Sequence, residues 1–358
     1  ASNNEPRFDY DPVTLEAKGL LIEESRTNLI LRSEDFTTVW APVRASILSN
    51  QVIAPDGNLT ADKLVEDTSS LPHRVTQSNN ILVVGRSYTF SIYAKAGERS
   101  SITLYETGST GSQRAATFNL LTGTVTGSNV AGYNVQNMGN GWYRCSISIP
   151  NVTNNAGVYA YIELNTGSTV YYQGDGSSGV YLWGAQLEEG SFPTSYIPTT
   201  TTAVTRQADN AVMTGTNFSS WYNQGEGTFY SESESSNTAS TASCIFSANT
   251  SATARIESYA SLDSHLIVDN AGSQASIDAG SFTKDVYSKV ACYYSSNNFA
   301  VSLNSGTVAV DTAGTVPAVL QLHIGSRYDG GNKLNGCIKK LTYYPKVVQQ
   351  YQLQILTK

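Results

Sequence analysis

The segment at residues 180–210, VYLWGAQLEEGSFPTSYIPTTTTAVTRQADN, constrains the fold of this chain more than any other part of the sequence. Its first eight residues alternate with a period of two, which predicts a β-strand. Pro193 and Pro198 then remove backbone donors and favour extended neighbours, so the sheet cannot simply continue. Four threonines at 199–202 have no apolar face to bury and suit an extended connector. We therefore predict two domains, at 1–192 and 209–358, joined by a Pro/Thr linker at 193–208.

The composition and the spacing of apolar runs favour an all-β chain of two β-sandwiches. With 358 residues, the chain is long enough for two cores, and its 29 glycines, 22 tyrosines and 14 % charged residues disfavour helices. Strand-like runs of five to nine residues recur between Gly, Asn and Ser clusters, as in a sandwich or jelly roll. In the first half they lie at 19–24, 28–40, 63–67, 87–97, 101–107, 116–127, 141–150, 157–165 and 180–188. Turns are predicted at Thr122–Gly123 and at 304–306, and the last dozen residues suit a short helix.

The charge pattern excludes some classes of partner. The net charge is −7 and no Lys/Arg stripe occurs, so we expect no nucleic-acid partner. No run of about 18 apolar residues exists, so we expect no membrane insertion, and the N-terminus lacks the basic and apolar regions of a signal peptide. The four cysteines, Cys145, Cys244, Cys292 and Cys337, form no CxxC pair. We interpret them as buried free thiols, which favours folding in a reducing cytoplasm.

One pair of carboxylates invites an enzymatic interpretation. Glu232 and Glu234 stand at i and i+2 on a predicted strand, which places them on one face about 7 Å apart. Such pairs serve glycoside hydrolysis, but the same pattern is typical of the solvated face of a half-buried strand, and we favour that alternative. His73, His265 and His323 lie in unrelated segments without HxH or HExxH spacing, so neither a zinc site nor a catalytic triad is predicted.

A structural calcium ion is the one cofactor that the sequence suggests. Lectin-like sandwiches often hold such an ion between an N-terminal strand and the last strand, on carboxylate and carbonyl oxygens. Glu23, Glu24 and Glu188 would supply ligands if those two strands meet.

The aromatic residues of the first half suggest glycan binding. Sugars present C–H faces that stack on flat rings, and hydroxyls that bond to polar side chains. Candidates on predicted strands are Tyr93, Tyr105, Tyr159, Tyr161 and Trp183. Tyrosine is also a common strand residue, so packing remains an equal alternative for the group. Trp40 and Trp142 are expected in the core.

Long stretches of the sequence resemble a known pair of modules. The residues at 6–36, GNGWYRCSISI at 139–149 and the residues at 181–209 resemble the carbohydrate-binding-type jelly roll of many tailed-phage virion proteins. The residues at 287–317 and 324–348 are similar to the concanavalin A-like (laminin-G-like) sandwich that often follows that module. The resemblance implies a non-enzymatic virion protein of a tail fibre, tailspike or similar appendage, assembled in the host cytoplasm and located on the tail or capsid surface.

The same resemblance implies the partners. These are a host cell-surface polysaccharide or lipopolysaccharide, other virion proteins, and further copies of the chain in a homotrimer. It assigns no ligand-binding residues. Three alternatives stay open: a purely structural capsid-decorating or tail-connecting protein, a glycan-degrading tailspike that uses Glu232 and Glu234, and an accessory binding module of a secreted enzyme.

Overall fold

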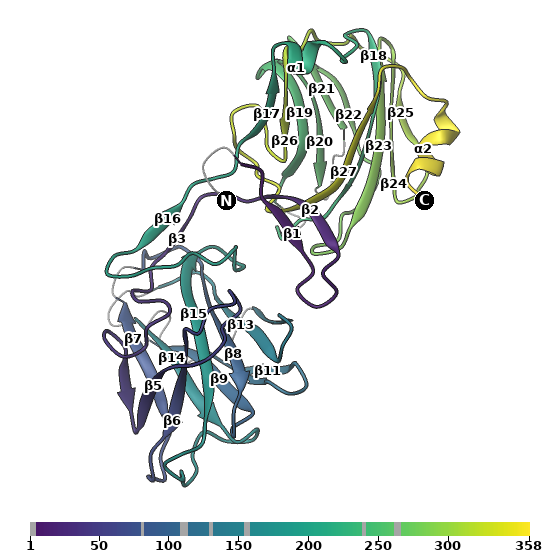
Figure 1. The fold of residues 1–358 in the computed structure, drawn as a ribbon. Coiled ribbons are helices and arrows are strands. Elements are labelled where there is room, and N and C mark those ends of the chain that lie inside the picture. Colours follow the sequence, from purple (N-terminus) through teal and green to yellow (C-terminus); the bar gives the residue numbers. More distant parts are fainter. Residues whose placement is uncertain are drawn as a thin grey trace. The chain divides into compact units, whose positions relative to one another are not determined.

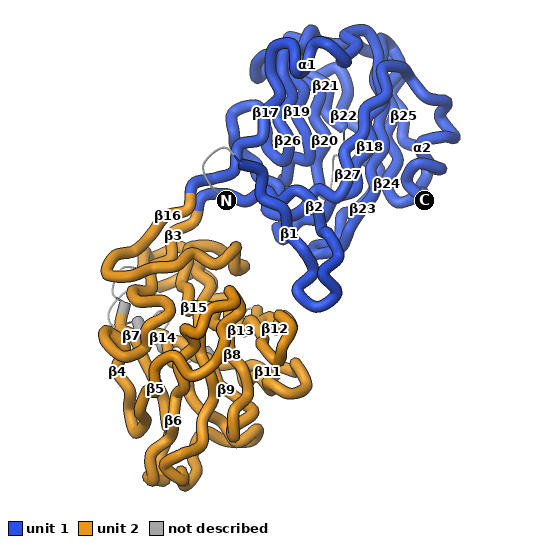
Figure 2. Tube along the Cα trace, viewed as in Figure 1, with its two compact units in different colours: residues 1–25, 207–358 blue, residues 26–206 orange. Residues whose placement is uncertain are grey.

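The computed structural model describes residues 5–79, 82–107, 114–128, 132–153, 158–237, 241–260 and 266–358. In this part of the chain almost all regular structure is β-strand, and every strand pair is antiparallel, which confirms the all-β prediction. The chain divides into two compact units, coloured separately in Figure 2. Unit 1 contains residues 1–25 and 207–358, and unit 2 contains residues 26–206.

Unit 2 is a sandwich of two six-stranded sheets (Figure 1). The first, which we call the tyrosine sheet, has the order β11-β10-β9-β14-β7-β4, and the second, the tryptophan sheet, has the order β12-β13-β8-β15-β6-β5. The strands of the tyrosine sheet are β4 (Ala41–Val43), β7 (Arg74–Asn79), β9 (Ser101–Thr107), β10 (Arg114–Asn119), β11 (Thr124–Ser128) and β14 (Val158–Asn165). Those of the tryptophan sheet are β5 (Ala45–Val52), β6 (Ala61–Glu66), β8 (Tyr88–Ala96), β12 (Gly132–Asn137), β13 (Trp142–Ile149) and β15 (Gly179–Glu189).

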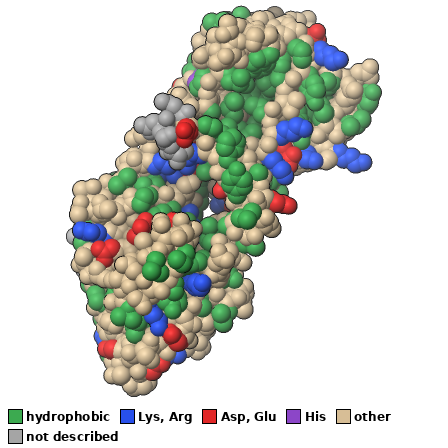
Figure 3. Space-filling model, viewed as in Figure 1, with side chains coloured by type: hydrophobic (Ala, Val, Ile, Leu, Met, Phe, Trp, Pro, Cys, Tyr) green, Lys and Arg blue, Asp and Glu red, His purple; other side chains and the backbone are tan. Residues whose placement is uncertain are grey.

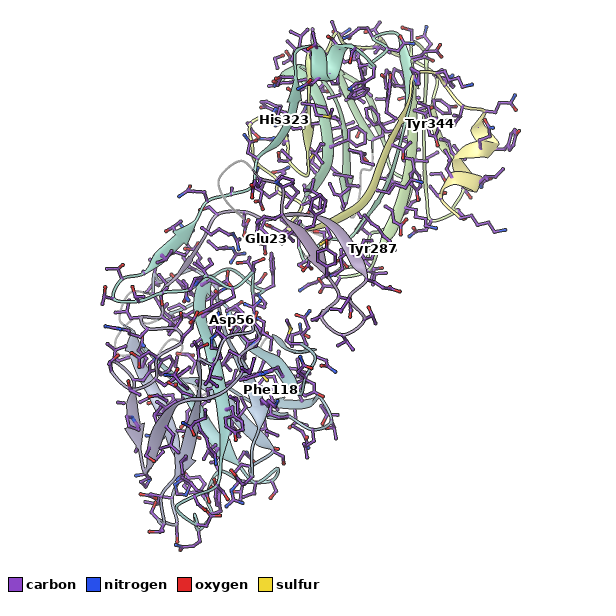
Figure 4. The ribbon with its side chains drawn as sticks, viewed as in Figure 1. Glu23, Asp56, Phe118, Tyr287, His323 and Tyr344 are labelled. Carbon is purple, nitrogen blue, oxygen red and sulfur yellow. The ribbon has the colours of Figure 1, made fainter. Side chains whose placement is uncertain are left out.

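The core of unit 2 lies between these two sheets. Alternate residues of each strand point inward, so Ile102 and Ile162 of the tyrosine sheet meet Phe90 and Leu182 of the tryptophan sheet. Phe118, labelled in Figure 4, is fully buried in the same cluster. This inward alternation leaves the opposite face of each sheet to polar and aromatic side chains.

Unit 1 is a second sandwich, of a seven-stranded sheet (β1-β2-β27-β18-β23-β24-β25) and a six-stranded sheet (β17-β26-β19-β20-β21-β22). The strands of the seven-stranded sheet are β1 (Phe8–Tyr10), β2 (Ala17–Ile22), β18 (Glu226–Ser233), β23 (Ser288–Ser295), β24 (Asn298–Leu303), β25 (Ala309–Asp311) and β27 (Gly336–Tyr344). Those of the other are β17 (Ala211–Thr214), β19 (Ser243–Ser251), β20 (Ala254–Ala260), β21 (Leu266–Asn270), β22 (Ser273–Ile277) and β26 (Gln321–Ile324). Two short helices, α1 (Thr216–Ser219) and α2 (Gln350–Leu356), complete the unit, and Leu353 of α2 is fully buried beside Tyr293.

The N-terminal segment belongs to unit 1, which differs from the predicted domain at 1–192. Strand β2 pairs with β27, with Leu20 opposite Ile338, and Ile22 is buried in the core of unit 1. Alternation in a sequence predicts a strand but not its partner, so the period of two did not reveal that residues 17–22 join a strand more than 300 positions later.

The segment predicted as a linker at 193–208 is largely part of unit 2. Thr194 and Thr199 are buried, and the Thr199 hydroxyl donates to the carbonyl of Ile30 across 2.6 Å. The Asn28 side chain donates to the carbonyl of Ile197 across 2.8 Å. Strand β16 (Val204–Arg206) then pairs with β3 (Arg26–Asn28). The first and last segments of unit 2 therefore form one two-stranded ribbon.

Several local predictions are confirmed. Gly123, with φ +66°, lies in the turn between β10 and β11, and Asn304 and Ser305 adopt positive φ between β24 and β25. The terminal helix is α2, Trp40 and Trp142 are buried, and all four cysteines are buried free thiols. The strand expected at 28–40 is wrong. Only Arg26–Asn28 forms a strand there, and the Gln77 side chain instead bonds to both backbone groups of Leu31.

Candidate functional site

Two of the predicted aromatic residues stand side by side on the outer face of the tyrosine sheet. Tyr105 on β9 is directly opposite Tyr161 on β14. Their rings are stacked, with centroids 4.6 Å apart and planes at 16°. Their strand neighbours Leu104 and Ile162 point into the core, and the alternation therefore directs both tyrosines outward, where each is half-buried. An offset stack of this kind is favourable beyond its burial alone.

A partly buried ion pair completes the cluster. Arg74 on β7 places its guanidinium 4.8 Å from the centre of the Tyr161 ring, and its Nη1 donates to Oε1 of Glu163 across 3.0 Å. The same carboxylate lies near Tyr105 and contributes to the raised pKa of its phenol. Glu163 therefore fixes Arg74 beside the Tyr161 ring, on which Tyr105 stacks. We call these four residues the Tyr–Arg cluster.

Burial sets the protonation of the cluster. It raises the pKa of Glu163, against the hydrogen bond from Arg74, which lowers it. Burial also raises the pKa of Tyr105 to about 12, and the nearby carboxylate of Glu163 adds to this shift. At neutral pH the Tyr105 phenol is therefore a neutral donor beside a guanidinium that stays charged.

A row of small polar residues lies beside the cluster. Along one line across the sheet, Glu163 is opposite Thr103, which is opposite Thr117. The two threonine hydroxyls are 3.0 Å apart, and the Asn165 side chain donates to Thr103 across 2.9 Å. This face therefore offers two flat rings and a guanidinium, and the carboxylate of Glu163 and the hydroxyl of Thr103 are buried beneath them.

The other predicted glycan-binding residues lie differently. Tyr159 is on β14, two residues before Tyr161, and its side chain is outside those that the structure describes. Tyr93 and Trp183 are opposite each other on β8 and β15, only 6 % and 4 % exposed. Their rings form edge contacts with one another at 5.2 Å, and Tyr196 covers Trp183 at 4.6 Å. Tyr93 and Trp183 therefore pack in a small second core on the outer face of the tryptophan sheet, with Trp142, Ala54 and Ala61.

The predicted calcium ligands belong to different units. Glu23 and Glu24 belong to unit 1 and Glu188 belongs to unit 2. The Glu23 carboxylate pairs with Arg7 at 2.9 Å (Figure 4 labels Glu23), and Glu188 is fully buried. Oxygens of Glu188 accept hydrogen bonds from the Gln186 amide and from both the backbone and the hydroxyl of Thr194, at 2.6 to 2.9 Å. Three hydrogen bonds therefore already use the Glu188 carboxylate. No group of three metal-ligating side chains occurs among the described residues, and calcium binding stays a prediction.

The two glutamates of the enzymatic alternative each pair with a lysine. Glu234 lies 2.9 Å from Lys18, and Glu232 lies 3.7 Å from Lys339. A bulge on the partner strand β27 interrupts the register beside Glu232. His73 and His323 lie in different units, and His265 is outside the described residues. Of the helices in the described part of the chain, none has the length and apolar run needed to cross a membrane.

Sequence reasoning missed Arg74 and Glu163. Glu163 carried a signal, because it follows Tyr161 at i+2 and therefore shares its face of the strand. Arg74 carried none, because it lies 89 positions before Glu163 and reaches the cluster only through the pairing of β7 with β14.

The sequence matches no model of a known protein family, and no curated protein matches it. Solved structures with some similarity include domains LG4-5 of the mouse laminin alpha1 chain, at 9 % identity and a TM-score of 0.28, over 77 % of this chain and 86 % of that one. Another is the CBM22-1 xylan-binding domain of Paenibacillus barcinonensis Xyn10C, at 11 % identity and a TM-score of 0.30, over 47 % and 94 %. The CBM22-1-CBM22-2 tandem of the same protein has 8 % identity and a TM-score of 0.30, over 91 % and 98 %. At these TM-scores, none of the likenesses assigns a ligand to this chain.

Proposed function

We propose that unit 2 binds a glycan on the outer face of the tyrosine sheet, at the Tyr–Arg cluster. The observation that carries the proposal is the stack itself, in which Tyr105 lies on Tyr161 and Glu163 holds Arg74 beside the Tyr161 ring. On the far side of the stack, Tyr105 is opposite Ala115 of β10, which has a small side chain.

The chemistry of the cluster suits a sugar better than other ligands. A pyranose ring packs its C–H groups on an aromatic ring, and its hydroxyls accept hydrogen bonds from the Arg74 guanidinium, which Glu163 already orients. The fixed ion pair lowers the entropy lost on binding. A single shallow site of this kind binds weakly, and several copies on one assembly raise the overall affinity.

We further propose that the chain is part of a tail fibre or similar phage appendage that contacts host cell-surface polysaccharide or lipopolysaccharide. This second proposal is supported by the resemblance of the sequence to the jelly-roll module of phage virion proteins, at residues 6–36, 139–149 and 181–209. On this proposal the chain is a homotrimer located in the virion, attached to other virion proteins. Tail or capsid genes beside its gene would support the assignment, and neighbours that encode secreted polysaccharide-degrading enzymes would contradict it.

A glycan array tests the binding proposal directly. The full chain is displayed multivalently, as wild type, Tyr161→Ala and Tyr133→Ala, the last being an exposed tyrosine of β12 on the other sheet. We expect wild type and Tyr133→Ala to bind the same glycans, and Tyr161→Ala to bind at least about tenfold more weakly, a loss of about 1.4 kcal/mol. If wild type binds neither glycans nor cells at high valency, the receptor role is wrong and the structural alternative gains support.

A further inference from the structure

Unit 1 contains a cavity that the proposed glycan site does not use. Its volume is 610 Å³, within the range of small-molecule sites. The walls come from both sheets of the sandwich. Met213 of β17 and Leu322 and Ile324 of β26 lie on one side, and Phe229 of β18 and Leu341 and Tyr343 of β27 lie on the other. Figure 3 shows hydrophobic side chains gathered over the middle of unit 1, where Figure 1 places β17 and β26 on one side and β27 on the other.

The cavity has a buried floor and an open rim. Phe229 and Leu322 are 1 % and 2 % exposed and belong to the core of unit 1, whereas Ser220 and Pro345 at the rim are exposed. The sheets therefore stand apart at this end, and apolar surface of the core faces the opening. An apolar group that fills this space removes apolar surface from water, which favours binding.

The polar atoms of the aromatic walls already have partners. The Tyr343 hydroxyl accepts from the backbone N–H of Asn223 and lies 3.0 Å from the Tyr294 hydroxyl. The indole Nε1 of Trp221 donates to the carbonyl of Asn217 across 2.6 Å. A sugar would bring many hydroxyls into a space whose aromatic polar atoms already have partners, and burying unpaired hydroxyls is unfavourable. An apolar molecule meets no such penalty.

The shape of the walls suits a ring system. Trp221 and Tyr343 meet edge to face at 5.1 Å, and Phe229 lies 4.8 Å from Tyr343, so one side of the cavity is built of flat rings. On the opposite side, Met213 is half-buried on the edge strand β17, and its unbranched side chain can adapt to an occupant. The exposed Ser220 hydroxyl at the rim can bond to one polar group of the ligand.

We infer that this cavity is a binding site for a compact apolar organic molecule that contains a ring system and carries at most one polar group, at the rim. This site is independent of the glycan site, because the cavity is formed within unit 1 and the Tyr–Arg cluster lies in unit 2. A chain with both sites takes two chemically different ligands.

Titration of the full chain with the neutral fluorophore N-phenyl-1-naphthylamine tests the inference. We expect saturable binding of one molecule per chain, with energy transfer from tryptophan, since Trp221 lines the cavity. Met213→Trp and Leu341→Trp place an indole in the cavity from opposite sheets, and each is expected to weaken binding at least tenfold. Val310→Trp, at an exposed position of β25, is the matched control and is expected to bind as wild type does.

The outcomes are decisive in either direction. Circular dichroism and thermal unfolding identify any variant that fails to fold. If one of the two cavity-filling variants, Met213→Trp or Leu341→Trp, does not fold, binding is compared between wild type and the other one. Absence of saturable binding to wild type would overturn the inference, as would equal binding by wild type and a folded filled variant. Tyr161→Ala is expected to bind the fluorophore normally, so loss of glycan binding and loss of this site are distinguishable.

Discussion

Arg7 and Asp209 form a bidentate ion pair across 202 positions of the sequence, with Nε of Arg7 donating to Oδ1 of Asp209 at 2.9 Å. The second oxygen of Asp209 also accepts the backbone N–H of Glu23 at 2.7 Å. Burial lowers the pKa of Arg7, but its hydrogen bond to Asp209 and the charge of Glu23 outweigh this and raise it. The pair fixes the N-terminal segment beside the point where the chain returns to unit 1, which explains why residues 1–25 fold with residues 207–358.

Replacement of Ile22 by alanine is expected to destabilise unit 1 by about 2–5 kcal/mol, because it leaves a cavity in the core. Ile22 is 2 % exposed, and a Cβ built on Gly325 would lie 2.6 Å from its side chain, so the packing there is close. Urea unfolding of the full chain measures the loss. Val13→Ala, at an exposed position of the same N-terminal segment, serves as the control and is expected to change stability by less than about 0.5 kcal/mol. Equal effects of the two changes would show that this segment is not part of the core.

Replacement of Gly184 by alanine is expected to destabilise unit 2 by about 1–3 kcal/mol. Gly184 lies in the bulge of β15 with φ +65°, and a Cβ there would be 2.9 Å from the Tyr93 ring. Gly57, with φ +88° and no atom within 4 Å of a built Cβ, offers a control that has the backbone strain without the clash. Thermal unfolding should show the larger loss for Gly184→Ala. If the two variants lose the same stability, the contact between the new Cβ at position 184 and the Tyr93 ring does not contribute to the destabilisation.

The four thiols are expected to be unreactive in the folded chain. Burial raises the pKa of the Cys292 and Cys337 thiols to about 12 and raises those of Cys145 and Cys244 as well. The thiolate is the reactive form, so at pH 8 the rate with a disulfide reagent should fall roughly a thousandfold below that of a free cysteine. Absorbance during reaction with dithionitrobenzoate is expected to show no thiols before and four after denaturation. Fewer than four after denaturation would contradict the free thiols.

The local alternation of apolar residues predicted most of the strands, whereas the composition of the Tyr–Arg cluster depends on pairing between strands that are distant in the sequence. The alternation in β8, β14 and β15 was enough to predict those strands, because side-chain direction depends on the nearest residues alone. The sequence predicts a spacer at 193–208 because Pro193 and Pro198 interrupt the sheet and the threonines at 199–202 have no apolar face. In the structure these residues are held to unit 2 by hydrogen bonds such as that from the Asn28 side chain to the Ile197 carbonyl. The periodicity of a sequence does not predict hydrogen bonds of this kind. Arg74 enters the candidate site for the same reason, through a strand pairing that sequence spacing does not encode.

Tyr93→Ala and Tyr161→Ala are expected to separate packing from binding. Tyr93 lies in the small second core with Trp183, so its loss should lower the stability of unit 2 by about 3 kcal/mol. Tyr161 is half-buried on the outer face, so its loss should cost less stability and more glycan affinity. Urea unfolding and binding to the glycan identified by the array measure the two effects. A folded Tyr93→Ala variant that loses binding as Tyr161→Ala does would move the glycan site to the tryptophan sheet.

The pH dependence of stability should report the buried Glu163. Because burial raises its folded-state pKa above the ordinary value of 4.5, the folded chain binds this proton more tightly than the unfolded chain does. The resulting stabilisation is fully present below pH 4.5 and is lost as the pH rises through the folded-state pKa. Glu163→Gln has no such proton, so its stability relative to wild type should be higher at pH 7 than at pH 4. Tryptophan fluorescence in urea follows mainly unit 2, which contains Trp40, Trp142 and Trp183. If the stability difference between wild type and Glu163→Gln is the same at both pH values, the carboxylate titrates normally and the electrostatic description of the Tyr–Arg cluster is wrong.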